Sequence, residues 1–104
     1  MFHALAATKP PNVVELWDWT LGVGDRHLSE PHTAGTRALV QVHEGTIAIS
    51  SGEQTVTRNV RGALSFLGDL AHSYVNAGPQ TPRFSVTVLD PGVGSATRTD
   101  RSYA

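Results

Sequence analysis

The chain is 104 residues long, which is the size of a single domain. Its 8 Lys and Arg and 9 Asp and Glu give a net charge of -1, which excludes a basic surface for nucleic acid or anionic lipid. The chain has no cysteine, which excludes disulfides, a thiol nucleophile and thiolate metal ligands. The sequence shows neither a membrane-spanning run of ~20 apolar residues nor a secretory signal pattern. We therefore expect a cytoplasmic protein without membrane contact.

The N-terminal part of the chain divides into an extension and a strand. For residues 1–12 we expect an extension with a short helix over residues 2–7, ended by Pro10 and Pro11. Residues 13–21 then predict an opening strand with Trp17 and Trp19 on one face.

The middle of the chain predicts further strands. Turn-forming residues recur every eight to twelve positions, a rhythm typical of an all-β sandwich or barrel. Residues 46–50 and 54–58 predict a hairpin in which Gly52 supplies a positive φ. Three runs alternate so that one set of apolar side chains faces inward. These inward residues are Ala38, Val40 and Val42, then Ile47 and Ile49, then Phe84, Val86 and Val88. We expect antiparallel sheets over residues 13–91 and a poorly ordered tail over residues 92–104.

Two of the five histidines are candidates for a metal site. His32 precedes an inward-facing strand and shares that face with Ala34 and Ala38 if the chain has no bulge at Gly35. His72 shares another face with Tyr74 and Asn76, so the two histidines are predicted to face one interior. Catalytic zinc needs three protein ligands, and alanine supplies no donor atom.

Two segments of the sequence resemble the two motifs of the cupin superfamily. The first is EPHTAGTRALVQVHEG, from Glu30 to Gly45, and the second runs from Gly62 through Asp69 to His72-Ser73-Tyr74-Val75-Asn76. Their wording is most similar to the C-terminal cupin domain of bacterial Xre-type helix-turn-helix transcriptional regulators. The resemblance covers residues 14–91 and implies a single antiparallel β-barrel, the double-stranded β-helix or jelly roll.

The resemblance also assigns the metal ligands of the family to positions in this chain. His32 and His72 match two family histidines, whereas Ala34 and Ala38 replace a third histidine and a glutamate. The metal candidates are therefore His32 and His72, an incomplete set. We expect no cofactor; the alternative is a divalent metal (Zn, Mn, Fe or Ni) at low occupancy.

Small barrels either bind one small ligand or fill their interior with side chains. The candidate ligand-binding residues are His32, His72, Tyr74, Phe66 and Val40. The alternative is a packed core, which is the expected role of Phe66 and Phe84. The remaining histidines, at positions 3, 27 and 43, are predicted to lie on the surface, and Arg37 is predicted to point outward into solvent.

Three functions remain open. The first is the effector-sensing, dimerising domain of a transcriptional regulator, which binds a small molecule and makes no nucleic-acid contact of its own. The second is a stand-alone metal-dependent cupin enzyme of dioxygenase or isomerase type with a His-only site. The third is a purely structural dimerisation domain with a filled barrel. The resemblance also implies a homodimer that pairs through an outer sheet face, with residues 13–21 as the candidate exchanged strand.

Overall fold

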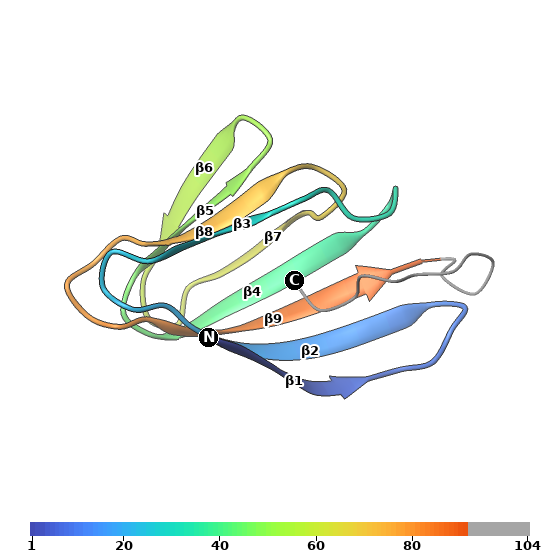
Figure 1. Cartoon of the computed structure of the whole chain (residues 1–104), viewed down its shortest axis with the longest axis horizontal. Helices are drawn as coiled ribbons and strands as arrows, with labels where there is room; N and C mark the ends of the chain where they lie inside the picture. The colour runs from blue at the N-terminus through green and yellow to red at the C-terminus, as the bar shows by residue number, and fades with distance from the viewer. Residues whose placement is uncertain (92–104) are drawn as a thin grey trace.

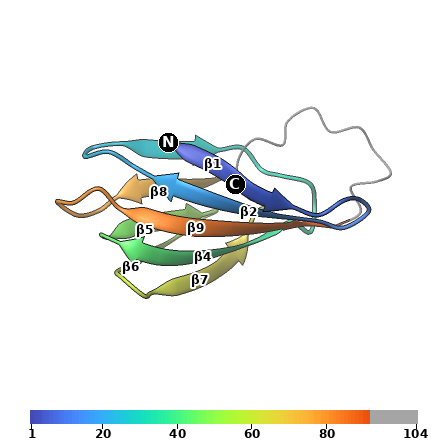
Figure 2. The same ribbon diagram turned by 90° about the horizontal axis from the view of Figure 1, so that it is seen from below.

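The computed structural model describes residues 1–91, which form nine strands in two facing antiparallel sheets (Figures 1 and 2). The larger sheet has the strand order β1-β2-β9-β4-β7, and the smaller has the order β3-β8-β5-β6. Their bounds are β1 Phe2–Ala7, β2 Val13–Thr20, β3 Arg26–Ser29, β4 Arg37–Glu44, β5 Ile47–Ser51, β6 Gln54–Arg58, β7 Ala63–Leu67, β8 His72–Asn76 and β9 Arg83–Asp90. None of the described residues forms a helix able to cross a membrane.

The all-β prediction is confirmed, but the two sheets are not closed into a barrel. The order of strands ends at β7 in one sheet and at β6 in the other, and no pairing joins them in residues 1–91. The two end strands, β6 and β7, lie at the same side of the molecule (Figure 2). Residues of both strands line a cleft.

The alternation of side chains predicted the inner face of the larger sheet correctly. Ala38, Val40 and Val42 of β4 are buried, and so are Phe84, Val86 and Val88 of β9. Strand pairing arranges the inward residues in rows across the sheet. One row runs Glu15, Val88, Ala38, Phe66, and the next runs Trp17, Val86, Val40, Leu64. Because side chains of one parity share a face, each row presents one layer of side chains to the smaller sheet.

The predicted hairpin is present as β5 and β6. Ser51 pairs with Gln54, so only Gly52 and Glu53 form the loop. Gly52 has a φ of 59°, the left-handed conformation that favours glycine in such a two-residue loop.

The predicted helix over residues 2–7 is wrong, because this segment is β1. Phe2 pairs with Trp19 and Ala4 pairs with Trp17, so β1 extends the larger sheet beside β2. The ring of Phe2 lies 4.6 Å from that of Trp19. A helix of six residues has little stability of its own in water, whereas a strand here pairs with β2, with one irregularity between Ala4 and Ala6, and gains an aromatic contact. Residues 2–7 are thus a strand of the larger sheet, and residues 8–12 connect this strand to β2.

The strand predicted over residues 13–21 is β2, which ends one residue earlier, at Thr20. It pairs with β1 on one edge and with β9 on the other, both from its own chain. The tail predicted over residues 92–104 lies outside the described residues.

Candidate functional site

The structure brings His32 and His72 together between the sheets. Their ring centroids are 5.4 Å apart. His72 lies on β8 and is buried, whereas His32 lies in the loop before β4. The backbone N–H of His32 donates to the carbonyl of Gly68 over 2.9 Å, which fixes that loop to the end of β7.

A hydrogen bond of the His72 ring determines whether Nε2 is a donor or an acceptor toward the interior. Its Nδ1 donates to the carbonyl oxygen of Leu70 over 2.9 Å. A neutral imidazole with a proton on Nδ1 has a lone pair on Nε2. Nε2 is buried and has no hydrogen-bond partner among residues 1–91. His72 therefore presents an acceptor to the interior.

The residues around this pair do not fit a metal centre. Ala38 is buried on the inner face but has no donor atom, and Ala34 is exposed in the loop. Ala34 was expected on the inner face only if the chain had no bulge at Gly35; this condition is not met, because Gly35 has a φ of 87° and β4 begins only at Arg37. In the described part of the chain no cluster of three or more His, Cys, Asp or Glu could hold a metal. Two imidazoles are fewer ligands than either a catalytic or a structural zinc site needs.

Aromatic rings fill the interior beyond the histidines. Tyr74 is completely buried, and its ring lies 5.0 Å from Trp19 and 5.4 Å from Phe84. Burial raises the pKa of the Tyr74 phenol, which therefore stays neutral. Its hydroxyl has no hydrogen-bond partner among residues 1–91. Val40 is also buried on this inner face. These rings pack against one another in the interior.

His27 does not lie on the surface as predicted. It is half-buried on β3, with its ring 4.6 Å from that of Trp19. Burial lowers the pKa of His27, and positive charge on His72 and on the Met1 amino group lowers it further. The sequence contained little signal for β3, which has only four residues, and its pairing of His27 with Tyr74 appears only in the fold. His3 and His43 are exposed, as predicted.

A cleft of about 600 Å³ opens between β6 and β7. Phe66 lies in its wall, and the Phe66 ring is 5.4 Å from the ring of His72. Phe66 thus separates the cleft from the buried polar atoms of His72 and Tyr74. Of the five predicted ligand-binding residues, Phe66 lines this cleft, whereas His32, His72, Tyr74 and Val40 are not part of its wall. Arg37 is exposed as predicted but also lines the cleft, which its outward parity did not indicate.

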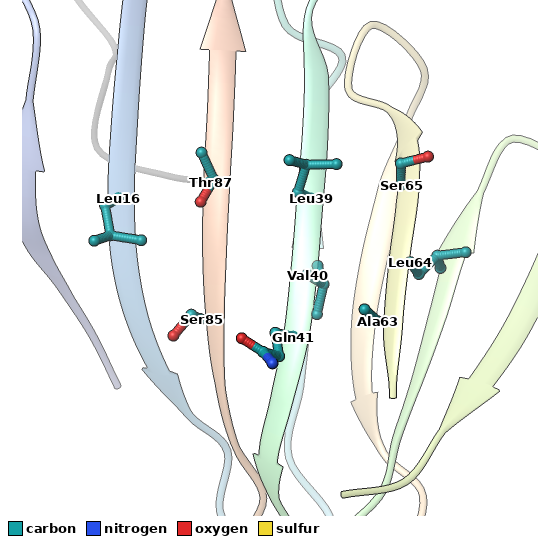
Figure 3. A pocket seen from close by; sticks show the side chains of 9 residues that line it. All are labelled: Leu16, Leu39, Val40, Gln41, Ala63, Leu64, Ser65, Ser85 and Thr87. Carbon is teal, nitrogen blue, oxygen red and sulfur yellow. The ribbon is translucent and has the colours of Figure 1, made fainter. Parts of the chain in front are cut away.

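The outer face of the larger sheet carries a second, shallower hollow of about 680 Å³ (Figure 3). Leu16, Thr87 and Leu39 point toward the viewer from three neighbouring strands, β2, β9 and β4 (Figure 3). Leu39 is 57% exposed, and Leu67 and Leu89 are also exposed. We call Leu16 and Leu39, which line this hollow, the outer leucine face; Leu67 lines the cleft between β6 and β7 instead. A cluster of uncovered leucines on a flat sheet is typical of a protein contact.

Two facing antiparallel sheets in this order, with a histidine loop before β4 and a second histidine on β8, define the cupin fold. Solved structures agree with this assignment. An HTH_3 family transcriptional regulator from Vibrio cholerae is 23% identical, with a TM-score of 0.79 over 86% of this chain. The alignment covers 50% of that regulator, so this chain spans half of its length.

Two further structures have the same fold. The Cupin_2 domain of an XRE family transcriptional regulator from Enterobacter cloacae is 20% identical, with a TM-score of 0.67 over 86% of this chain and 97% of that one. A double-stranded β-helix protein from Klebsiella pneumoniae is also 20% identical, with a TM-score of 0.61 over 88% of this chain and 76% of that one. No protein-family model and no curated protein matches the sequence.

Proposed function

We propose that this cupin domain senses a small molecule and forms the dimer of a transcriptional regulator. The observation that carries the proposal is the cleft between β6 and β7. Its volume of about 600 Å³ lies within the range of small-molecule sites, and its wall contains the aromatic ring of Phe66. The fold is shared with two regulators, from Vibrio cholerae and Enterobacter cloacae, which supports the regulatory role.

The chemistry of the interior favours binding over metal-dependent catalysis. The donor set around His32 and His72 does not fit a metal, so nothing in the described residues favours the dioxygenase or isomerase alternative. The net charge of -1 gives the domain no surface for DNA, so the proposed domain acts on DNA through a reader attached to it.

We assign the dimer contact to the outer leucine face. A second copy would cover Leu16 and Leu39 and remove their apolar surface from water. Because β2 is paired on both edges within its own chain, this contact needs no exchange of residues 13–21. An effector bound in the cleft would change DNA binding only if it favoured one arrangement of the two copies.

Two measurements test the proposal. A thermal-shift screen with small acids, sugars and amino acids is expected to give stabilising ligands; no shift across a broad set would favour the purely structural domain. Light scattering at micromolar concentration is expected to show a dimer, which Leu39→Asp converts to a monomer. The matched control is Leu28→Asp, because Leu28 is 65% exposed on the other sheet. A monomeric wild-type protein would contradict the dimer.

A further inference from the structure

The cleft between β6 and β7 has a deep apolar part. Ile49 of β5 is buried at its base, and Val56, Leu64 and Phe66 are half-buried in its walls. These four side chains come from both sheets, so the apolar surface surrounds the space from two sides. Such a surface is suited to an aliphatic or aromatic group, because burying that group removes apolar area from water.

The mouth of the cleft carries one positive and one negative side chain. Arg37, at the start of β4, and Glu53, in the β5–β6 loop, both line it and are both exposed. Neither forms an ion pair with another residue of the described chain, where the salt bridge present joins Arg83 to Asp18. Arginine presents a planar fork of donors that matches a carboxylate, and a carboxylate accepts hydrogen bonds from an ammonium group.

The polar atoms beside Phe66, Nε2 of His72 and the hydroxyl of Tyr74, do not favour a charged ligand. The His72 imidazole offers an acceptor from Nε2, and burial keeps the Tyr74 phenol neutral. Burying an unpaired charge costs several kcal/mol. The charged groups of a ligand therefore belong at the mouth, beside Arg37 and Glu53, and its apolar group belongs in the deep part.

We propose that the ligand of this cleft is a free α-amino acid with an apolar side chain. Its carboxylate binds Arg37, its ammonium group binds Glu53, and its side chain lies among Ile49, Val56, Leu64 and Phe66. This assignment rests on the proposed sensing function and names the ligand class. It uses both charges at the mouth and the apolar walls, whereas a simple acid or a simple amine would leave one charge without a partner.

Calorimetric titration of the whole chain with three matched probes tests the assignment. L-phenylalanine carries both charged groups, 3-phenylpropionate lacks the ammonium group, and 2-phenylethylamine lacks the carboxylate. Because both protein charges are exposed, each contact is worth about fivefold in Kd. L-phenylalanine is expected to bind about fivefold more tightly than either analogue. Equal binding of all three probes would overturn the assignment.

Variants at the mouth separate a direct contact from a general effect on stability. In Arg37→Gln, L-phenylalanine should bind no better than 2-phenylethylamine, because the partner of the carboxylate is gone. In Glu53→Gln, it should bind no better than 3-phenylpropionate. The matched controls are Arg26→Gln and Glu44→Gln, exposed residues that do not line the cleft. A preference for L-phenylalanine that survives both cleft variants would overturn the assignment.

The screen of small molecules separates failure of this assignment from failure of the sensing function. If sugars or simple acids stabilise the protein and L-phenylalanine, L-leucine and L-methionine do not, the sensing function stands and the amino-acid assignment is wrong. If no small molecule stabilises the protein, both are wrong.

Discussion

Nδ1 of His72 donates a hydrogen bond of 2.9 Å to the carbonyl oxygen of Leu70, two residues earlier in the chain. This contact directs the Nε2 lone pair into the interior, the orientation that a metal-binding histidine would have. The imidazole of His32 stands near it, with the ring centroids 5.4 Å apart. Two imidazoles are fewer ligands than a zinc site needs.

The first prediction concerns metal. Because two imidazoles make a weak site, dialysis against EDTA should leave the melting temperature unchanged. Elemental analysis of protein purified without a metal-affinity step should give far less than one metal per chain. A stoichiometric metal whose removal lowers the melting temperature would restore the enzyme alternative.

The second prediction concerns alkaline pH. Burial raises the folded-state pKa of Tyr74 above its ordinary value of 10.0. Above that pH the unfolded state loses a proton that the folded state keeps, so stability should fall by up to about 1.4 kcal/mol per pH unit. Urea unfolding between pH 8 and 11 measures this slope, and Tyr74→Phe should reduce it. Ionisation of Tyr74 near pH 10 in the folded protein, seen by ultraviolet absorbance, would contradict the prediction.

The third prediction concerns mildly acidic pH. Burial, followed by the charges on His72 and the Met1 amino group, lowers the folded-state pKa of His27 below 6.5. As the pH falls, His27 therefore binds a proton in the unfolded state at a higher pH than in the folded state. The stability contributed by neutral His27 is present above pH 6.5 and is lost as the pH falls toward the folded-state pKa. His27→Phe should reduce the pH dependence of the unfolding free energy between pH 7 and 5. The control His3→Gln changes an exposed histidine and should keep the slope.

The fourth prediction compares two glycines with positive φ. Gly24 has a φ of 78° and open space where a Cβ would lie, so Gly24→Ala should cost about 1 kcal/mol. Gly45 has a φ of 73°, and a Cβ there would lie 2.8 Å from Cα of Pro82. Gly45→Ala should therefore cost about 2 kcal/mol or more, since backbone must move as well. Equal unfolding free energies for the two variants would show that the Pro82 contact is unimportant.

The fifth prediction tests whether β1 belongs to the folded core. Phe2→Ala removes the ring that stacks on Trp19 and approaches Trp17 within 5.6 Å, and should cost about 1–3 kcal/mol. Leu5→Ala changes a side chain of the same strand that is 59% exposed, and should cost about 0.5 kcal/mol or less. Similar small losses for both variants would mean that β1 contributes little to stability.

The alternation of apolar residues was sufficient to predict most of the larger sheet. Each inward residue of β4 and β9 was correct because the period of two is a local property of a strand. The helix over residues 2–7 failed for the opposite reason. What makes that segment a strand is its pairing with β2, which is absent from the local pattern.

The site residues divide in the same way. The motifs indicated His32 and His72, and the fold brings them together. The parity of Arg37 pointed that residue to solvent, and His27 was also predicted to lie on the surface. Arg37 is long enough to line the cleft beside the edge strand β7, and β3 places His27 against Trp19.

Composition, alternation and the two motifs were thus sufficient to predict a nearly neutral, all-β chain with the cupin fold, because these are properties of residue type and local spacing. The cleft exists because β6 and β7 are the last strands of their sheets and do not pair with each other among residues 1–91. The walls of the cleft come from strands of both sheets, and these strands are brought together only when both sheets pack on the aromatic core. Charged residues make up only 16% of the chain, and the fold places two of them with opposite charge, Arg37 and Glu53, at the mouth of that cleft.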